Sequence, residues 1–358
     1  MAVAQKMDIM EIDISEIPEV IQMAINLKEA GEDINLLFHG SPGIGKTQSI
    51  FSSLQKAGYT TRLLGAPTMD PVDIGGFPMI NVEEKTTGWA PPTALVCPPG
   101  EKLAIFVDEI NRASTMVQNS LLSMFQERRV RDFKLDPSTL LIAAANREQD
   151  DVGLQQVSRA MNNRFIHIYV RTAITGFLKY AIGAGIHPAI LGSLKFRPDL
   201  LNPAYDDSST EAKKEAQKWK NEKAFPTPRA WETVSKLMNK GTPNRNMLTA
   251  MVAGTIGYGP TIEVMAYWDA LNSLPSIDSI FLNPDTAKLP EEPSQCYAVS
   301  IAIARRMDDE NLERGIQYLK RMGLEYNVLT VKETIRKNEK LVHTNAYLNW
   351  AIEFDGKF

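Results

Sequence analysis

Short apolar runs and amphipathic stretches alternate along the first half of the chain. Five runs of strand length are almost continuously apolar, and turn or helix signals follow each one; they span 34–38, 60–64, 103–107, 140–145 and 165–170. Strands of this composition are covered on both faces, which is typical of a parallel sheet between two layers of helices. Periodic apolar positions predict connecting helices over about 47–56 and 114–127. The pattern therefore predicts an α/β fold with a five-stranded parallel sheet.

An amphipathic helix is predicted ahead of the first strand, over 15–30. Ser15 is suited to cap it, and Pro18 and Glu19 suit its first turn. One apolar stripe runs along it, formed by Ile17, Val20, Ile21, Ala24 and Ile25.

Helical patterning replaces the strand signals after residue 170. It is clearest over 177–194, over 228–274 and from about 295 to 358, with prolines at 284, 290 and 293 between the last two stretches. Residues 203–223 hold five acidic residues and five lysines, spaced as on the solvated face of a helix, which indicates an exposed insertion. We predict a first domain over 1–171, a helical domain over 172–284 that contains this insertion, and a helical C-terminal region over 285–358.

The composition narrows the class of protein further. The chain has 358 residues, which suits two or three structural units, and its 39 basic and 43 acidic residues give a net charge of −4. This balance argues against a polybasic nucleic-acid wrapper, although it leaves room for a local basic groove. Two cysteines exclude a disulfide scaffold. No apolar run is long enough for a membrane span, and residues 1–13 lack the layout of a signal peptide, so we expect a cytoplasmic protein without membrane contact.

The strongest chemical signal is the segment 40–47, which reads GSPGIGKT. It directly follows the first predicted strand and opens a helix, the context in which a glycine-rich loop binds phosphate. Backbone N–H groups and the helix N-terminus would cradle the anion, Lys46 would contact the β- and γ-phosphates, and Thr47 would coordinate Mg²⁺. The predicted nucleotide-binding set is Gly40, Ser41, Pro42, Gly43, Ile44, Gly45, Lys46, Thr47 and Gln48.

Polar residues end two further strands. Asp108 and Glu109 follow the buried run 103–107, and Asn146 closes the run 140–145. The carboxyl ends of parallel strands form the edge where ligands bind. Asp108 would hold Mg²⁺ directly or through water, Glu109 would polarise the attacking water, and Asn146 would hydrogen-bond the γ-phosphate or that water.

Taken in order, these motifs resemble those of AAA+ ATPases. The residues within these motifs are similar to those of the MoxR branch, which has DEINRA at the second acidic motif, here 108–113. That branch also has an Arg-Phe pair before the last core strand, here Arg164 and Phe165, and a Pro-Arg pair that opens a lid helix, here Pro228 and Arg229. The segment 70–78, DPVDIGGFP, resembles the place where this branch inserts a hairpin near a central pore. The resemblance covers about 34–238 and implies a P-loop NTPase core followed by an all-helical lid.

The resemblance also implies an oligomer, usually a hexameric ring, with ATP and Mg²⁺ at each subunit interface. Arg164 would then act in trans on the γ-phosphate of the neighbouring subunit, with Arg159 as the alternative in the same loop. Arg229 would sense the γ-phosphate in cis from the lid. The basic segment 127–134 is either a solvated hairpin or a loop directed to the pore, where Phe77 and Trp89 could also lie.

Two functions remain open at this point. The favoured one, implied by the resemblance, is a chaperone-like ATPase that remodels a protein client together with a partner carrying a von Willebrand factor A domain. The other is a nucleic-acid-dependent NTPase of a restriction or replication system. The absence of a dedicated basic DNA-binding motif in the sequence argues against the second, so we do not expect nucleic acid as a partner.

Overall fold

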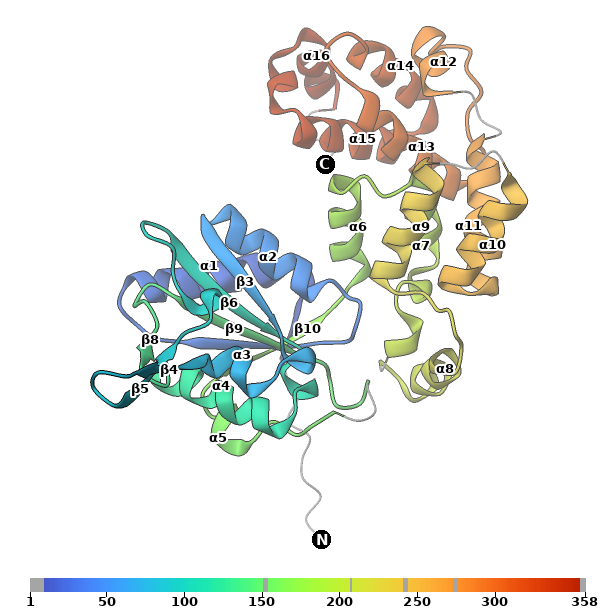
Figure 1. Ribbon diagram of the computed structural model, residues 1–358. Helices are drawn as coiled ribbons and strands as arrows, with labels where there is room; N and C mark the ends of the chain where they lie inside the picture. Colours follow the sequence, from blue (N-terminus) through green and yellow to red (C-terminus); the bar gives the residue numbers. More distant parts are fainter. Residues whose placement is uncertain (1–9, 151–153, 207, 241–243, 273–275, 355–358) are drawn as a thin grey trace. The chain divides into compact units, whose positions relative to one another are not determined.

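A computed structural model describes residues 10–150, 154–206, 208–240, 244–272 and 276–354. The first nine residues, most of the segment in which a signal peptide was sought, lie outside this part. The chain divides into two compact units, Met1–Gly176 and Phe177–Phe358. The first unit holds the sheet and the second is helical (Figure 1).

The sheet of the first unit is parallel throughout, in the order β1-β10-β2-β9-β6-β3. All five predicted strands are confirmed; they are β2 (Asn35–His39), β3 (Tyr59–Gly65), β6 (Lys102–Asp108), β9 (Leu140–Ala145) and β10 (Ile166–Arg171). The prediction of five strands is one short, because β1 (Glu11–Asp13) pairs with β10 at the edge. This segment has a single apolar residue, so only its pairing with β10 reveals it as a strand.

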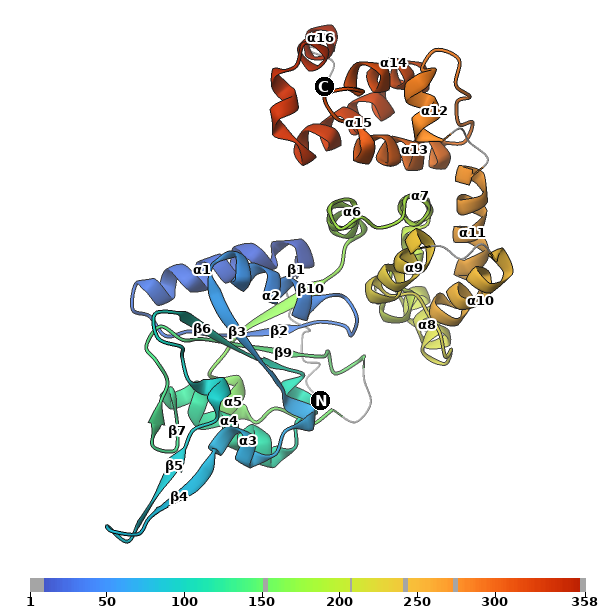
Figure 2. The ribbon, with the colours of Figure 1, turned by 45° about the horizontal axis from the view of Figure 1, so that its top comes forward.

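Alternate residues of the central strands enter two separate hydrophobic cores. Leu103, Ile105 and Val107 of β6 pack with α4 (Thr115–Glu127), whereas Ala104 and Phe106 pack on the opposite face. That second face is covered by α1 (Ile17–Glu29) and α2 (Lys46–Lys56) (Figure 2). Burial on both faces explains the continuous apolar runs and fixes the ends of the strands at one edge.

The cap predicted for α1 is wrong. Asp13 accepts hydrogen bonds from the backbone N–H and the hydroxyl of Ser15, and a short 3₁₀ turn (Ile14–Glu16) precedes the helix. Another oxygen of the Asp13 carboxylate accepts the N–H of Ala173, 2.7 Å away, at the start of α6 (Ile174–Gly183). Asp13 therefore caps the 3₁₀ turn, and Glu16, the residue before α1, makes no side-chain cap of its own.

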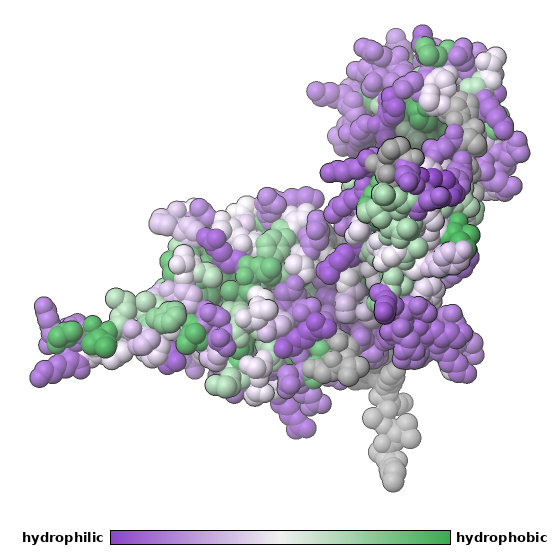
Figure 3. Space-filling model, turned by 45° about the vertical axis from the view of Figure 1, so that its right-hand side comes forward, coloured by the Kyte–Doolittle hydropathy of each residue, from purple (hydrophilic) through white to green (hydrophobic). Residues whose placement is uncertain are grey.

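Two hairpins extend from the first unit. β4 (Phe77–Asn81) and β5 (Thr86–Ala90) form an antiparallel ribbon, and β7 (Arg129–Val130) pairs with β8 (Phe133–Lys134). The first confirms the hairpin expected at the segment 70–78, since β4 begins inside this segment, directly after α3 (Pro71–Gly75) and Gly76. It carries exposed apolar residues behind a hydrophilic tip (Figure 3), and Phe77, Met79, Ile80 and Val82 are between 61% and 80% exposed.

The guanidinium of Arg131, in the β7–β8 turn, lies over the ring of Trp89 at 3.7 Å from the centroid. At the base of the ribbon, a Cβ added to Gly76 would lie 2.0 Å from the carbonyl oxygen of Ala90. The two hairpins are therefore attached to each other, and the first is closely packed where it begins.

The second unit is built from helices, as predicted. They are α7 (Pro188–Phe196), α8 (Thr210–Lys220), α9 (Pro228–Lys240), α10 (Arg245–Ile256), α11 (Tyr258–Asn272), α12 (Ile277–Leu282), α13 (Pro293–Arg306), α14 (Leu312–Met322), α15 (Leu324–Lys337) and α16 (Asn345–Glu353). The helical stretch expected over 177–194 is broken between α6 and α7, where Gly185 has a φ of +74°. The charged insertion forms α8, with an ion pair between Glu215 and Lys218 at 2.7 Å. None of the described helices is at once long and apolar enough to cross a bilayer.

Candidate nucleotide-binding site

The glycine-rich loop 40–45 joins β2 to α2, as the sequence predicts. Gly43 and Gly45 have φ values of +75° and +101°, a region that side chains disfavour, and Gly45 immediately precedes the helix. A Cβ on Gly40 would lie 2.9 Å from the carbonyl oxygen of Val170 and from the Ile44 side chain. The glycines of the loop thus leave its backbone unobstructed, and the loop leads into a helix N-terminus. This is the arrangement that binds phosphate.

Lys46 lies at the centre of the site with 7% of its surface exposed. Its Nζ donates to the carbonyl oxygens of Gly40 at 2.7 Å and Ser41 at 3.0 Å, and lies 3.5 Å from Oδ1 of Asn146. Burial lowers the pKa of Lys46 to about 8, although the carboxylates of Asp108, Asp150 and Glu109 oppose this shift. A cation held only by carbonyl and amide oxygens is available to a phosphate group.

Thr47 and Asp108 are brought together although 61 positions separate them in the sequence. The hydroxyl of Thr47 donates to Oδ2 of Asp108 at 2.7 Å, and Oδ1 of Asp108 accepts the N–H of Glu109 at 2.9 Å. A hydroxyl and a carboxylate are oxygen donors of the kind that Mg²⁺ prefers. The donor set therefore fits the predicted ion.

Glu109 has a left-handed backbone, with φ +53° and ψ +42°. This conformation is uncommon for a residue with a side chain and stores strain. Its carboxylate lies 3.6 Å from the guanidinium of Arg112, and both side chains are about two fifths exposed, at 39% and 41%. The turn directs Glu109 out of the strand, to where water reaches its carboxylate. Periodicity gives no sign of this turn.

Asn146 follows β9 and is 4% exposed. Its side-chain Nδ2 is buried and has no hydrogen-bond partner among the described residues. Unsatisfied buried donors are rare in native proteins, and one that points into a binding site indicates a missing ligand atom. The side chain of Asn111 bonds the backbone of Asn146 on both sides, and sequence reasoning missed Asn111 because its partner is 35 positions away.

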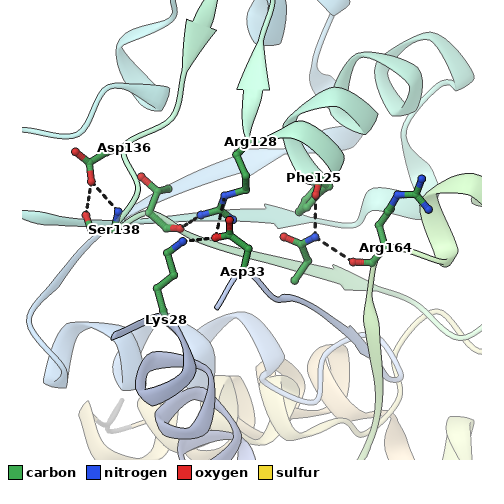
Figure 4. A network of polar contacts seen from close by, with 9 residues as sticks. Lys28, Asp33, Phe125, Arg128, Asp136, Ser138 and Arg164 are labelled. Atoms are coloured by element: carbon green, nitrogen blue, oxygen red, sulfur yellow. Dashed lines mark hydrogen bonds and ion pairs between the residues drawn. The ribbon is translucent and has the colours of Figure 1, made fainter. Parts of the chain in front are cut away.

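The three candidate arginines are placed differently. Arg159 begins α5 (Arg159–Asn162) and is exposed, and Arg164 follows that helix. The backbone oxygen of Arg164 accepts from the Asn35 amide at 3.0 Å, while its guanidinium is directed away from this network (Figure 4). Neither guanidinium has an ion-pair partner within the described ranges. Arg229 is an exposed first-turn residue of α9 in the second unit, so its role stays a prediction.

Two histidines connect the phosphate loop to the turn before Arg164. His39, just ahead of Gly40, is 2.9 Å from His167 through their ring nitrogens, and the other ring nitrogen of His167 bonds the carbonyl oxygen of Asn162 at 2.8 Å. Because a carbonyl only accepts, Nε2 of His167 donates to Asn162, and the tautomer with its single proton there accepts from Nε2 of His39 at Nδ1. The Tyr169 ring stacks on His39, with centroids 4.7 Å apart.

This pair predicts a loss of stability in acid. Burial, then the neighbouring His167 and Lys46, lowers the pKa of His39 to about 4. In the unfolded chain His39 takes up a proton below about pH 6.5, whereas in the folded chain it stays neutral down to about pH 4. The neutral pair therefore makes its full contribution to the free energy of unfolding above about pH 6.5. It should fall by at most about 1.4 kcal/mol per pH unit as the pH drops toward 4. Hydrogen exchange of the β2 amides between pH 7.5 and 5, corrected for intrinsic rates, measures it.

His39→Gln keeps a donor for His167 and removes the titrating group, so the pH slope of β2 protection should decrease. His343→Gln, at an exposed position of the second unit, is the matched control and should leave that slope unchanged. An identical slope in wild type and His39→Gln would contradict the assignment.

Comparison with known proteins finds similarity over the first unit. The family model described as "ATPase family associated with various cellular activities (AAA)" matches residues 35–167. Chaperone MoxR1 of Mycobacterium tuberculosis is 30% identical over 154 residues, which are 41% of this chain and 38% of that protein. The Holliday junction branch migration complex subunit RuvB of Flavobacterium psychrophilum is 29% identical over 119 residues, 33% of this chain and 28% of that protein.

The alignments therefore span well under half of either relative's length. A solved structure of the Thermotoga maritima RuvB Holliday junction branch migration motor is 18% identical. It superposes with a TM-score of 0.36, covering 94% of this chain and 86% of that one.

Proposed function

We propose that residues 35–167, which match the family model of AAA ATPases, form an AAA+ ATPase domain of the MoxR type, and that the protein binds ATP with Mg²⁺ and hydrolyses it. The observation that carries the proposal is the hydrogen bond from Thr47 to Asp108, beside the buried Lys46. This bond joins the start of α2 to the end of β6. Thr47 and Asp108 are the two residues that would hold Mg²⁺.

Each side chain then has a separate task. The backbone N–H groups of 43–47 and the Lys46 ammonium would bind the phosphates, and Thr47 and Asp108 would hold Mg²⁺, which would supply positive charge to the phosphate oxygens. The exposed Glu109 carboxylate accepts a proton from the attacking water. The free Nδ2 of Asn146 donates to the γ-phosphate or to that water.

Replacing Lys46 by alanine tests the phosphate-binding site. A hydrogen bond to a charged group contributes about 1.5–3 kcal/mol, so Lys46→Ala should weaken ATP binding about 10- to 150-fold and hydrolysis with it. Calorimetry with ATP measures the binding affinity. Phosphate release, assayed with and without Mg²⁺, measures the rate of hydrolysis. Lys56→Ala, at the exposed end of the same helix, should behave as wild type. Unchanged ATP affinity in Lys46→Ala would contradict the site.

We further propose that the protein acts as a homo-oligomeric ring, most simply a hexamer, in which Arg164 or Arg159 reaches the neighbouring nucleotide. Support comes from the lack of a partner for either guanidinium within the described part of the same chain. Sedimentation with ATP and Mg²⁺ should show a large assembly. A monomer that hydrolyses ATP at the full rate at every concentration would refute it.

The biological activity that we propose is chaperone-like remodelling of a protein client, with Arg229 coupling nucleotide state to the lid and a von Willebrand factor A domain protein as partner. The similarity to Chaperone MoxR1 supports it. Isolation of the ATP-bound protein from cytoplasmic extract should recover such a partner. The alternative, a nucleic-acid-dependent NTPase, is suggested by the similarity to RuvB. ATPase stimulation by DNA that falls steeply with salt would decide for it.

A further inference from the structure

The side-chain amide of Asn111 makes the two hydrogen bonds to the backbone of Asn146 that a neighbouring strand would otherwise make. β6 pairs with β9 up to Val107 and Ala143, after which the β6 chain turns away at Glu109. Beyond that point the side chain of Asn111 continues the pairing. Its Nδ2 donates to the carbonyl oxygen of Asn146 at 2.8 Å, and its Oδ1 accepts the Asn146 N–H at 3.1 Å. An amide can supply this donor and acceptor pair in one plane.

Both members of this contact are buried, since Asn111 is 6% and Asn146 4% exposed. A lost partner would therefore leave a buried backbone group of Asn146 without a hydrogen bond, which is costly. With its backbone held from both sides, Asn146 places Oδ1 3.5 Å from Lys46 and leaves Nδ2 free. Groups that are fixed before the ligand arrives lose less entropy during reaction.

Asn111 lies in the turn that follows Glu109. Asn111 lies two positions after Glu109 in one 3₁₀ turn, Ile110–Arg112, in which the N–H of Arg112 bonds the Glu109 carbonyl at 2.8 Å. Glu109 is in the left-handed conformation, so this turn is held by its surroundings rather than by local preference. The amide of Asn111 thus connects the turn that carries Glu109 to the end of the strand that carries Asn146.

We propose that Asn111 is a positioning residue for ATP hydrolysis, which acts through Asn146 and does not contact the nucleotide. The proposal rests on the hydrolysis proposed above. Because Asn111 acts through another residue, its removal should affect turnover more than binding.

A double-mutant cycle on kcat tests this route of action. Asn111→Ala should lower kcat about 10- to 100-fold, as expected for a small displacement of a reacting group, and change the ATP dissociation constant less than about threefold. In an Asn146→Ala background the same substitution should lower kcat less than about threefold. An equal loss of kcat in both backgrounds would overturn the proposal, because it would show that Asn111 acts independently of Asn146.

A buried amide in the neighbouring helix is the matched control. Gln118, on α4, is 3% exposed, and its Nε2 donates to the carbonyl oxygen of Ala113 at 3.2 Å. Gln118→Ala should lower the unfolding midpoint and leave kcat unchanged. A kcat loss in Gln118→Ala as large as that in Asn111→Ala would count against a specific role for Asn111. If Asn111→Ala does not fold, Asn111→Asp keeps the size and the acceptor and replaces the donating Nδ2 by a negatively charged carboxylate oxygen.

Hydrogen exchange gives a readout that does not depend on hydrolysis. The backbone N–H of Asn146 should exchange at least about tenfold faster in Asn111→Ala, and should be unaffected in Gln118→Ala. Unchanged protection of Asn146 in Asn111→Ala would overturn the proposal. If the wild type hydrolyses no ATP, the proposed function fails, whereas the positioning of Asn146 by Asn111 is still decided by this exchange rate.

Discussion

Arg164→Ala is expected to lower ATP hydrolysis about 10³- to 10⁵-fold while the protein still folds and binds ATP. The planar guanidinium neutralises phosphate oxygens as negative charge develops on them, and it does so most strongly in the transition state. In the described part of its own chain Arg164 has no ion pair, so its replacement by alanine breaks none there. Single-turnover hydrolysis and equilibrium ATP binding measure the two quantities.

A mixing experiment determines whether Arg164 acts in trans. Arg164→Ala and Lys46→Ala should each hydrolyse ATP more slowly than wild type on their own, but their mixture contains interfaces with an intact phosphate loop from one subunit and an intact arginine from its neighbour. Activity should therefore return in mixed assemblies. If assemblies shown to be mixed stay inactive, Arg164 does not act in trans. Arg159→Ala in the same assay decides between the two arginines.

Glu109→Gln is expected to bind ATP as wild type and to hydrolyse it about 10²- to 10⁴-fold more slowly. Glutamine keeps the size of the side chain and the left-handed turn, but an amide does not accept a proton from water. Phosphate release under saturating ATP measures the effect, and unchanged turnover would remove Glu109 from its assigned role.

The substitution also removes the ion pair with Arg112, so that contribution needs a separate control. Arg112→Ala breaks the same pair and keeps the carboxylate. Exposed ion pairs contribute at most about 1 kcal/mol, so hydrolysis in Arg112→Ala should stay within about fivefold of wild type. A loss as large as that of Glu109→Gln would assign the effect to the ion pair instead.

Much of the first unit could be predicted from the sequence because its strands are buried on both faces. Such strands are continuously apolar, and the first polar residue after each marks the sheet edge, which is how Asp108 and Asn146 were found. Gly43 and Gly45 were predictable for another reason, since their positive φ values require glycine.

The features that escaped prediction depend on contacts between distant segments. β1 is a strand because β10 offers an unpaired edge, and Asn111 matters because its amide meets Asn146. The pair of His39 and His167 spans 128 positions. In each case the residue type is common and its spacing carries no period, so only the folded chain reveals the partner.

The tight crossing of Gly76 and Ala90 has a mechanical consequence. A hairpin attached through a flexible loop would change its orientation when a force acts on its tip, and little of that force would reach the rest of the domain. A Cβ at position 76 would collide with the carbonyl oxygen of Ala90, and the guanidinium of Arg131 lies over the indole of Trp89. Both contacts restrain the β4–β5 hairpin where it begins, so a load on the hairpin is passed to α3 and to the β7–β8 turn.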